Sequence, residues 1–366
     1  MKKSKLNVLF IVYTLKKDGV SKSLETILNN IDLSKYNIYL RILAYSDFDI
    51  KINFKPEILY PSEIEFWNSI ISNKYYSYIE EKYDIVVSYS DLLSTKYIID
   101  SNTKGKKIAF IHGKFESIHK GYTNEYLKQL YDSIDNIICV SKSVQSSLLL
   151  NLGREYGNKS RVIYNPIDVE KIKQSSLEND GCEIFSQSDK DVNIICISRL
   201  SPEKRIDKII KIHKKLLDEN IKNKLTIIGE GELKEYLINL INKLGVNKTC
   251  KLKGYIENPY PYIRNSDISI LVSQEEGLPL VIMESMVLQK PIIGTQVSGI
   301  IDLLENKYGM ILKEDEESLY EGLKQMILNE NIRSEYINIL SKVDKFEFDK
   351  NEIIKKIETL FDQICN

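Results

Sequence analysis

Short apolar runs alternate with amphipathic stretches along most of the chain. Runs of strand length, rich in β-branched residues, are each followed by a polar turn and then by apolar residues at helical spacing. In the first half, the predicted strands are Asn7–Thr14, Ile38–Tyr45, Asp84–Ser90, Lys107–His112, Asn136–Ser141 and Arg161–Tyr164. Helices are predicted at Ser21–Asn30, Glu63–Lys82 and Tyr122–Ser133. Several strands are apolar on successive residues, which is typical of a parallel sheet covered by helices on both faces.

Residues 168–191 interrupt this alternation. They are rich in Ser, Asp, Glu, Lys and Gln and poor in apolar residues, which is typical of a linker. The alternation then resumes with predicted strands at Val192–Arg199, Lys224–Ile228, Cys250–Gly254, Ile268–Ser273, Pro291–Thr295 and Gly309–Leu312. We therefore predict an α/β protein with two doubly wound, Rossmann-like parallel-sheet domains, residues 1–167 and 192–345. A C-terminal helix within 346–366 is expected to pack back on the first domain. Ligands of such sheets bind at the carboxyl ends of the strands, so we expect the two domains to face a cleft that holds the site.

Composition narrows the class of protein. The 366 residues suffice for two cores, and 51 Lys+Arg against 52 Asp+Glu argue against a nucleic-acid partner. Five cysteines without a CxxC pair argue against a disulfide scaffold or a cysteine-based zinc site. No apolar run reaches the roughly 20 residues of a membrane span, and the basic start is too soon interrupted by charge for a signal peptide. A soluble, cytoplasmic protein is expected.

An acidic motif follows the strand at Ile268–Ser273. It reads Glu275-Glu276-Gly277-Leu278-Pro279, and Glu284 follows within a predicted helix. Proline suits the first turn of a helix. The free N–H groups and the positive end of the helix dipole there favour an anion. Carboxylates on each side of the anion could hold the hydroxyls that flank a diphosphate. The alternative is that these acidic residues only favour the helix start.

A basic motif follows the strand at Val192–Arg199. Arg199 offers a forked donor and Lys204 a point charge, and together they suit a leaving diphosphate. The alternative is a solvated basic turn. After the next strand, Gly229-Glu230-Gly231-Glu232-Leu233 could form a tight turn near a nucleotide, or simply a turn.

The three histidines are not spaced as metal ligands. His112 closes a strand and precedes Gly113, a position at the carboxyl edge that favours a functional role. His119 and His213 are interpreted as structural. Asp47-Phe48-Asp49 has the Asp-x-Asp pattern of some metal-dependent sugar transferases, but it is interpreted as a turn, and no metal site is predicted.

In their order along the chain, these motifs resemble the retaining, nucleotide-sugar-dependent glycosyltransferases of family 4, which have the GT-B fold. The matched elements are Ser198-Arg199-Leu200 with Lys204, the Gly229–Leu233 turn, the pair of glutamates Glu276 and Glu284, and the Asn165-Pro166-Ile167-Asp168 crossover. The resemblance implies catalytic roles for Glu276, Arg199, Lys204 and His112. It also implies donor contacts at Gly19, Gly229, Gly231, Tyr255, Gly277, Leu278, Pro279 and Glu284. At Gly19 the chain has one glycine where many relatives carry two.

The resemblance further implies the reaction. A hexose or N-acetylhexosamine is expected to move from a nucleotide diphosphate, most often UDP in the family, with retained anomeric configuration. The leaving phosphate takes the acceptor proton, so neither a metal nor another cofactor is expected. The acceptor is expected to be a glycan or lipid-linked glycan in surface-polysaccharide or glycolipid assembly.

Two rival functions and one structural question stay open. A nucleotide-sugar epimerase would need further acid and base side chains, and a silent sugar-nucleotide or glycan-binding protein would release no nucleotide. The stripe from Phe66-Trp67 to Tyr78-Ile79 has helical spacing. A core-facing helix is the favoured interpretation. The alternative is peripheral contact with the inner membrane surface near the acceptor.

Overall fold

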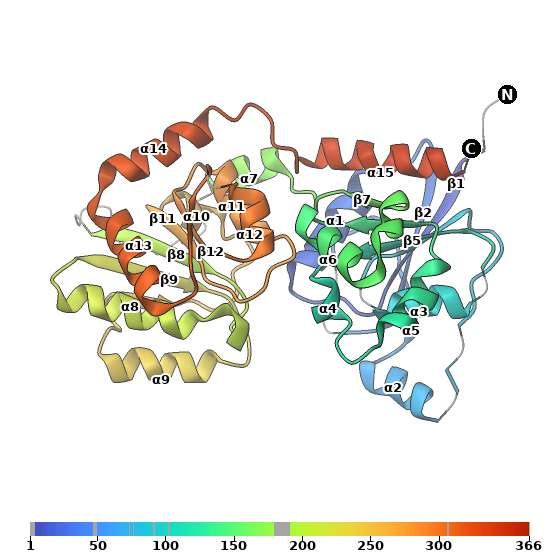
Figure 1. The fold of residues 1–366 in the computed structure, drawn as a ribbon, viewed down its shortest axis with the longest axis horizontal. Coiled ribbons are helices and arrows are strands. Elements are labelled where there is room, and N and C mark those ends of the chain that lie inside the picture. The colour runs from blue at the N-terminus through green and yellow to red at the C-terminus, as the bar shows by residue number, and fades with distance from the viewer. Residues whose placement is uncertain are drawn as a thin grey trace. The chain divides into compact units, whose positions relative to one another are not determined.

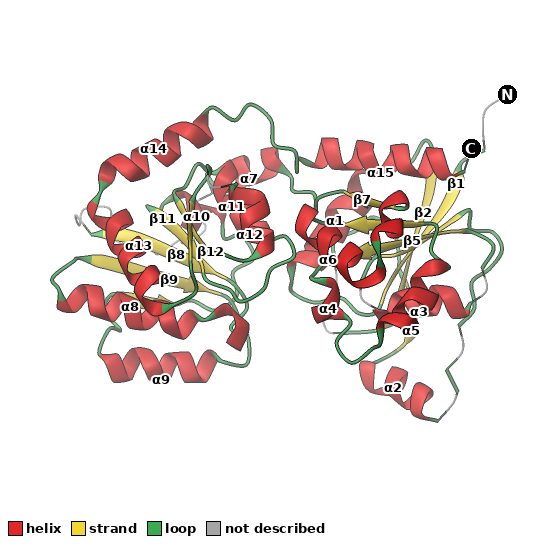
Figure 2. Ribbon diagram, in the orientation of Figure 1, coloured by secondary structure: helices red, strands yellow, loops and turns green. Residues whose placement is uncertain are grey.

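The computed structural model describes residues 4–46, 50–72, 74–75, 77–90, 92–101, 103–178, 191–305 and 307–365. The chain divides into two compact units, Met1–Ile167 with Glu347–Asn366, and Asp168–Phe346 (Figure 1). Each unit is a parallel sheet between helices (Figure 2). The Asp47-Phe48-Asp49 pattern and half of the predicted linker, residues 179–190, lie outside the described residues.

In the described part of the first unit, seven parallel strands form one sheet in the order β3-β2-β1-β4-β5-β6-β7. The strands are β1 (Leu6–Val12), β2 (Tyr36–Ala44), β3 (Glu57–Tyr60), β4 (Ile85–Ser88), β5 (Lys106–Ile111), β6 (Asn136–Cys139) and β7 (Ser160–Val162). The helices are α1 (Gly19–Asn30), α2 (Glu63–Ile71), α3 (Leu92–Asp100), α4 (Phe115–Ile118), α5 (Asn124–Asp132), α6 (Lys142–Leu152), the short 3₁₀ helix η1 (Arg154–Asn158) and α15 (Lys350–Ile364). The strand order reverses between β1 and β4, and such a reversal places a ligand site at their carboxyl ends.

Helix α15 comes from the C-terminus but belongs to the first unit. Its Phe361 is fully buried and packs edge-on against Tyr36 and Phe10, with ring centroids 5.7 and 6.4 Å apart. The chain leaving β7 pairs with the chain entering α15, because the Ile167 N–H donates to the Phe348 carbonyl at 3.1 Å. Helix α15 therefore contributes to the core of the first unit, although it follows the second unit in the sequence.

In the described part of the second unit, six parallel strands are ordered β10-β9-β8-β11-β12-β13. They are β8 (Val192–Ile197), β9 (Asn223–Ile228), β10 (Cys250–Leu252), β11 (Ile268–Leu271), β12 (Ile292–Thr295) and β13 (Met310–Leu312). The helices are α7 (Val169–Ser175), η2 (Pro202–Lys204), α8 (Ile206–Asp218), α9 (Lys234–Leu244), α10 (Tyr260–Arg264), α11 (Leu280–Val287), α12 (Ser298–Leu304), α13 (Glu316–Leu328) and α14 (Glu330–Ser341). The order reverses between β8 and β11, the two strands that precede the basic and the acidic motif.

The first part of the predicted linker is helical. Asp168 caps α7 by accepting a hydrogen bond from the Lys171 N–H at 3.0 Å, and Val169 and Ile172 are buried. Helix α7 packs against α10 and α11 of the second unit. Val169 and Ile172, three residues apart, thus give α7 one buried side, although most residues of this stretch are polar.

The helix predicted at Glu63–Lys82 ends at Ile71. Ser72 caps it through its hydroxyl, which donates to the Asn68 carbonyl at 2.6 Å. Beyond the cap, Ile79 is buried in the core of the unit and the Tyr75 ring packs on Phe66. These apolar side chains are therefore buried although the segment that carries them is not helical.

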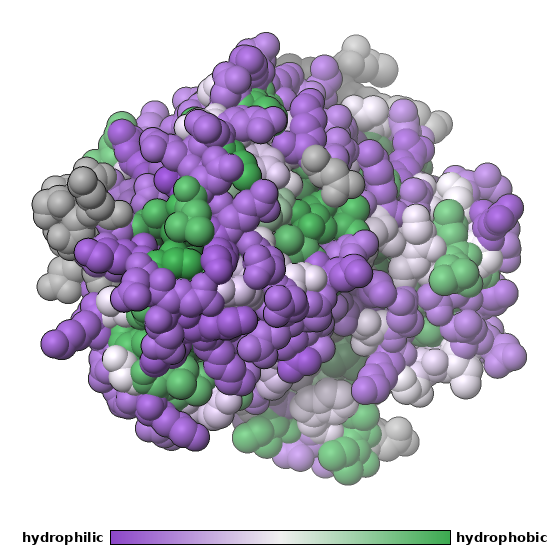
Figure 3. Space-filling view, turned by 60° about the vertical axis from the view of Figure 1, so that its left-hand side comes forward, coloured by the Kyte–Doolittle hydropathy of each residue, from purple (hydrophilic) through white to green (hydrophobic). Residues whose placement is uncertain are grey.

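The interpretation of the stripe on α2 as core-facing is wrong for most of its residues. Phe66 is buried, but Trp67, Ile70 and Ile71 are 43%, 36% and 81% exposed. The physical reason is position: α2 packs on β2 and the edge strand β3, and no described helix or strand covers its other side closely. Figure 3 shows a mostly hydrophilic surface with separate apolar patches, one of them at the lower edge, the height at which Figure 1 places α2. Within the described ranges, no helix has the length and apolar content that crossing a bilayer requires.

Candidate functional site

The loops after β8 and β11 meet at the carboxyl edge of the second sheet. The Lys204 ammonium lies 2.5 Å from the Glu276 Oε1, and the two side chains are only 11% and 12% exposed. The Gln274 N–H also donates to the Glu203 carbonyl at 2.9 Å. The structure therefore brings together Lys204 and Glu276, which are 72 residues apart in the sequence.

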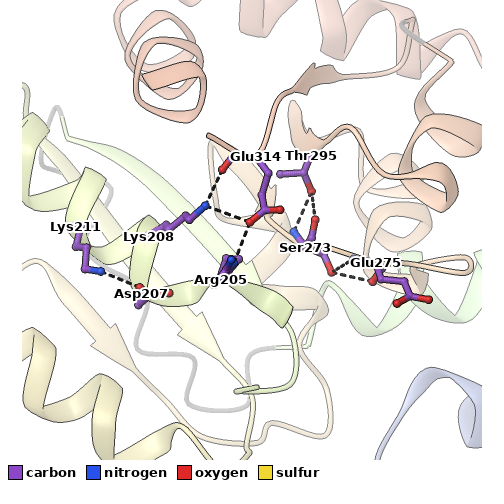
Figure 4. A network of polar contacts seen from close by, with 8 residues as sticks. All are labelled: Arg205, Asp207, Lys208, Lys211, Ser273, Glu275, Thr295 and Glu314. Carbon is purple, nitrogen blue, oxygen red and sulfur yellow. Dashed lines mark hydrogen bonds and ion pairs between the residues drawn. The ribbon is translucent and has the colours of Figure 1, made fainter. Parts of the chain in front are cut away.

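The loop that carries Glu276 is hydrogen-bonded to the end of β12. The Ser273 N–H donates to Thr295 Oγ1 at 2.9 Å, and that hydroxyl donates back to the Ser273 carbonyl at 2.7 Å (Figure 4). The Gly299 N–H donates to the Glu276 carbonyl at 3.2 Å. A side chain at Gly299 would collide with the carbonyl oxygens of Glu276 and Gly277, so the close approach requires glycine. Sequence reasoning did not single out Gly299, although a glycine soon after a predicted strand was a usable signal.

Helix α11 starts at Leu280, directly after Pro279. The first turn of a helix leaves N–H groups without intrahelical acceptors, and the dipole adds positive potential there. Gly277 and Leu278 lie just before this turn, between Glu276 and the helix. This arrangement can hold an anion beside the Lys204 ammonium.

Glu284 is buried inside α11, with 4% of its surface exposed. The Tyr260 hydroxyl donates to its Oε1 at 3.4 Å. Tyr260 lies at the start of α10 and belongs to none of the motifs found in the sequence. A buried carboxylate with a hydroxyl donor is suited to accept further hydrogen bonds from ligand hydroxyls.

Arg199 is exposed and pairs with Glu203. Its guanidinium donates to Glu203 Oε1 at 3.1 Å, and the Ser201 hydroxyl donates to the same oxygen at 2.6 Å. Burial raises the pKa of the Glu203 carboxyl, but the Ser201 hydrogen bond and the Arg199 charge outweigh it, so the pKa lies below its usual range. Glu203, in the turn η2, therefore holds Arg199 and Ser201 through one carboxylate oxygen.

The glycine turn after β9 packs closely on the loop after β8. Gly229 and Gly231 have φ of +150° and +156°, and a side chain on either would collide with backbone carbonyls of Ser198 or Leu200. The Gly229 N–H also donates to the Gly254 carbonyl at 2.9 Å. Tyr255, the next residue, is about half exposed. Both glycines and Tyr255 thus belong to one group of loops.

The residues predicted in the first unit are His112 and Gly19. His112 follows β5, and among the described residues neither of its ring nitrogens has a hydrogen-bond partner, although both are buried. Its ring lies against those of Tyr89 and Phe110, with centroids 4.8 and 5.9 Å away. Burial lowers the pKa of His112 to about 4, and the nearby Tyr89 backbone and Asn165 side chain offset only part of that shift. Gly19 is the first residue of α1.

The other two histidines are structural, as predicted. His119 is buried between the Phe115 carbonyl, at 2.8 Å, and the Tyr131 hydroxyl, at 3.0 Å. His213 is buried between Asn223 and Thr249. Both ring nitrogens of each are occupied, which sets His112 apart. Where the structure describes the chain, no group of three or more His, Cys, Asp or Glu side chains is placed to hold a metal ion.

Comparison with known proteins gives two family matches. The model described as "Glycosyl transferases group 1" matches residues 183–342, and "Glycosyltransferase Family 4" matches residues 52–171. Two relatives span most of the chain. N-acetylgalactosamine-N,N'-diacetylbacillosaminyl-diphospho-undecaprenol 4-alpha-N-acetylgalactosaminyltransferase of Campylobacter jejuni is 29% identical over 265 residues, 71% of this chain and 68% of that one. An uncharacterized glycosyltransferase of Methanocaldococcus jannaschii is 27% identical over 333 residues, 77% of this chain and 80% of that one.

Solved structures share the fold. The crystal structure of Anabaena HepE in complex with UDP superposes with a TM-score of 0.77 at 15% identity, covering 98% of this chain and 100% of that one. The crystal structure of TarM superposes with a TM-score of 0.71 at 15% identity, covering 98% of this chain and 99% of that one.

Proposed function

This chain belongs to the group 1 glycosyltransferases of family 4 and has their GT-B fold, and from this premise we propose that it transfers a sugar from UDP to a hydroxyl of a glycan acceptor. The sugar is a hexose or an N-acetylhexosamine, and its anomeric configuration is retained. The acceptor is a lipid-linked glycan of surface-polysaccharide or glycolipid assembly. The reaction takes place at the cytoplasmic face of a membrane.

The observation that carries this proposal is the Lys204–Glu276 pair beside the start of α11. Lys204 binds the donor diphosphate, assisted by Arg199 and by the N–H groups near Gly277 and Leu278. Glu276 accepts hydrogen bonds from hydroxyls of the donor sugar. Positive charge and carboxylate oxygens within one site suit a ligand that joins a diphosphate to a polyol.

The remaining contacts are those that the resemblance to the family implies. Glu284, buried inside α11, accepts hydrogen bonds from the ribose hydroxyls. The turn at Gly229 and Gly231 and the backbone near Tyr255 flank the base. In the first unit, His112 donates or accepts a hydrogen bond with a substrate hydroxyl, and Gly19 lets the backbone approach the substrate.

The chemistry follows from where charge develops. The bond between the anomeric carbon and the β-phosphate oxygen breaks, and its electron pair stays on the diphosphate. The acceptor oxygen bonds to the same face of the anomeric carbon, and its proton passes to the leaving phosphate. Lys204 and Arg199 stabilise the negative charge that grows on the diphosphate, a type of contact typically worth about 100-fold or more in rate.

The exposed face of α2 supports a membrane-bound acceptor. Ile64, Trp67 and Ile71 are exposed on this helix, which contacts the end of β1, since the Tyr13 hydroxyl donates to Glu63 at 3.0 Å. Lys16 and Lys17 are exposed in the loop after β1. Apolar side chains next to basic residues favour a bilayer with anionic headgroups. The Campylobacter jejuni relative, by its name, acts on a diphospho-undecaprenol-linked substrate.

Nucleotide-sugars screened against the purified chain test the donor. We expect a UDP-sugar to raise Tm, since a ligand at 100 times its Kd stabilises the folded state by about 2.7 kcal/mol. We also expect UDP release when lipid-linked glycans are added. Binding of a UDP-sugar without release of UDP would indicate a silent binding protein. Conversion of the nucleotide-sugar into its epimer in the absence of an acceptor would indicate an epimerase.

Flotation with phosphatidylglycerol vesicles tests the membrane contact. The double variant Trp67→Ser with Ile71→Ser should lose binding to the vesicles. Leu150→Ser on α6, where the leucine is 85% exposed, is the matched control and should bind as the wild type does. Equal binding of all three proteins would exclude α2 as the membrane contact.

A further inference from the structure

Arg205 has a backbone conformation that side chains disfavour. Its φ and ψ are +47° and +32°, in the left-handed region. The other described non-glycine residues with positive φ are Asn220, Gln289 and Glu305, and each follows the end of a helix, where this conformation is common. Arg205 likewise follows the end of a helix, the short 3₁₀ helix η2, but it also directly precedes α8. For a non-glycine residue this conformation has a cost that the surrounding contacts must offset.

Glu314 supplies contacts that hold this conformation. It lies in the loop after β13, and its Oε1 accepts from Arg205 Nε at 2.9 Å and from Lys208 Nζ at 3.1 Å (Figure 4). Lys208 Nζ also donates to the Glu314 carbonyl at 2.8 Å. Burial raises the pKa of Glu314, but its hydrogen bonds and the charges of Lys208 and Arg205 outweigh it, so the pKa lies below the usual range. The carboxylate is therefore ionised at neutral pH and fastens the start of α8 to the loop after β13.

This contact closes a series of links around the candidate site. The loops after β8 and β11 are joined by Lys204 and Glu276, and the loop after β11 is joined to the end of β12 by Ser273 and Thr295. The loop after β12 is joined to the end of β13, because the Gln296 N–H donates to the Leu312 carbonyl at 2.7 Å.

The last link runs from Glu314 back to Arg205. Lys204 is consequently held at both ends: its ammonium by Glu276, and its backbone through the neighbouring Arg205.

We propose that Glu314 and Arg205 form a latch that positions Lys204 against the donor diphosphate, an inference that rests on the proposed function. Neither residue is assigned contact with the substrate. By fixing Arg205 in the left-handed conformation, Glu314 sets the direction in which the Lys204 side chain leaves the backbone. Lys204 acts on charge that grows as the diphosphate leaves, so a loosened latch lowers kcat more than it raises KM.

The test combines two substitutions. Glu314→Gln keeps the shape of the side chain but removes the charge that binds Arg205 and Lys208. We expect kcat for the best UDP-sugar to fall about tenfold, with KM changed less than about twofold. Arg205→Gly should restore most of the lost kcat in the Glu314→Gln background, because glycine adopts the left-handed conformation without help. Glu317→Gln, an exposed glutamate of α13, is the matched control and should leave kcat unchanged.

A second readout is independent of turnover. Amide hydrogen exchange in residues 199–205 should be faster in Glu314→Gln and should slow again when Arg205→Gly is added. Unchanged exchange in Glu314→Gln overturns the latch, and so does a slow Glu314→Gln enzyme that Arg205→Gly leaves slow. Faster exchange reversed by glycine, in a chain that releases no UDP from any UDP-sugar, supports the latch and overturns the proposed function.

Discussion

The carboxyl edges of the two sheets follow the same strand order, with one further strand in the first sheet, but the groups around His112 differ in charge from those around Lys204. In the second unit this edge carries charged residues paired with each other, among them Lys204 with Glu276 and Arg199 with Glu203. In the first unit the corresponding edge carries His112, whose buried ring nitrogens have no partner among the described residues and whose pKa is lowered to about 4. Around it lie neutral groups, such as the Tyr89 hydroxyl 2.7 Å from the Ser23 hydroxyl.

The difference shows that a parallel sheet fixes where a site lies, while the residues after each strand decide what it can bind. Paired charges at the second edge suit an anion, because ligand phosphates and hydroxyls can replace the partners of Lys204 and Glu276. Neutral hydrogen-bonding groups at the first edge suit hydroxyls, because an uncharged histidine can donate at one nitrogen and accept at the other.

The largest effect is expected from the paired charges. Lys204→Ala and Glu276→Ala should each lower kcat about 100-fold or more, since each removes a group preorganised for the transition state. Steady-state rates of UDP release measure this loss. Lys211→Ala is the matched control, because Lys211 forms an exposed pair with Asp207 on α8, and it should keep the wild-type rate. Unchanged turnover in either site variant, with its Tm preserved, would remove that residue from the site.

A smaller effect is expected from the glycines of the two edges. Gly229→Ala should lower the free energy of unfolding by about 1–3 kcal/mol, because the new methyl group collides with the Ser198 carbonyl and φ is +150°. Gly19→Ala should be tolerated, since Gly19 is the first residue of α1 and does not have positive φ. Urea unfolding of the two variants measures the difference. Equal losses would mean that the Gly229 turn does not pack closely on the loop after β8.

Glu284→Gln should have a more modest effect, on binding. A hydrogen bond to a charged group is worth about 1.5–3 kcal/mol, and the amide retains one acceptor oxygen, so KM for the donor should rise about tenfold while kcat changes little. Calorimetry with UDP alone should give a similar loss of affinity. Tyr260→Phe, which removes only the hydroxyl 3.4 Å from Glu284, is the control for indirect effects and should change KM less. A fall in kcat with unchanged KM would argue against a ground-state contact at Glu284.

Much of the fold could be predicted because its signals are local. Successive apolar residues predict buried parallel strands, and all twelve predicted strands overlap strands of the structure. The edge strand β3 was missed, since its four residues are exposed or half-buried and carry no strong pattern. The exposure of Trp67 also escaped prediction, because periodicity shows that a helix has an apolar face but not whether another element covers it.

The site could be predicted only in part, for a similar reason. The sequence places Lys204 and Glu276 after two strands, and topology then brings the strand ends together. It gives no sign that Arg205 meets Glu314, 109 residues away, or that Tyr260 reaches Glu284. Such partners depend on the directions of side chains in the folded loops, which no local pattern encodes.

The smallest effect is expected from pH at the neutral edge. The pKa values of His112 and His119 are lowered to about 4 by burial, and that of His213 is also lowered. Neither His112 nor His119 therefore changes charge in the folded protein between pH 5.5 and 8, and kcat/KM should stay flat across this range. In the unfolded chain His112 titrates near pH 6.5. The unfolded state thus binds more protons below that pH, and His112 destabilises the fold progressively as the pH falls from about 6.5 to about 4.

Rates measured from pH 5.5 to 8, with unfolding free energies at pH 5 and 7, separate the two effects. His112→Gln should weaken the pH dependence of stability and lower kcat/KM, because glutamine takes no proton and places its donor and acceptor differently. His119→Gln should also weaken the pH dependence of stability but leave kcat/KM close to that of the wild type, since both nitrogens of His119 are used within the protein. If kcat/KM of the wild type changes with an apparent pKa near 6.5, and this change is absent from His112→Gln, then His112 is charged during turnover. The two edges would then not differ in charge as the structure indicates.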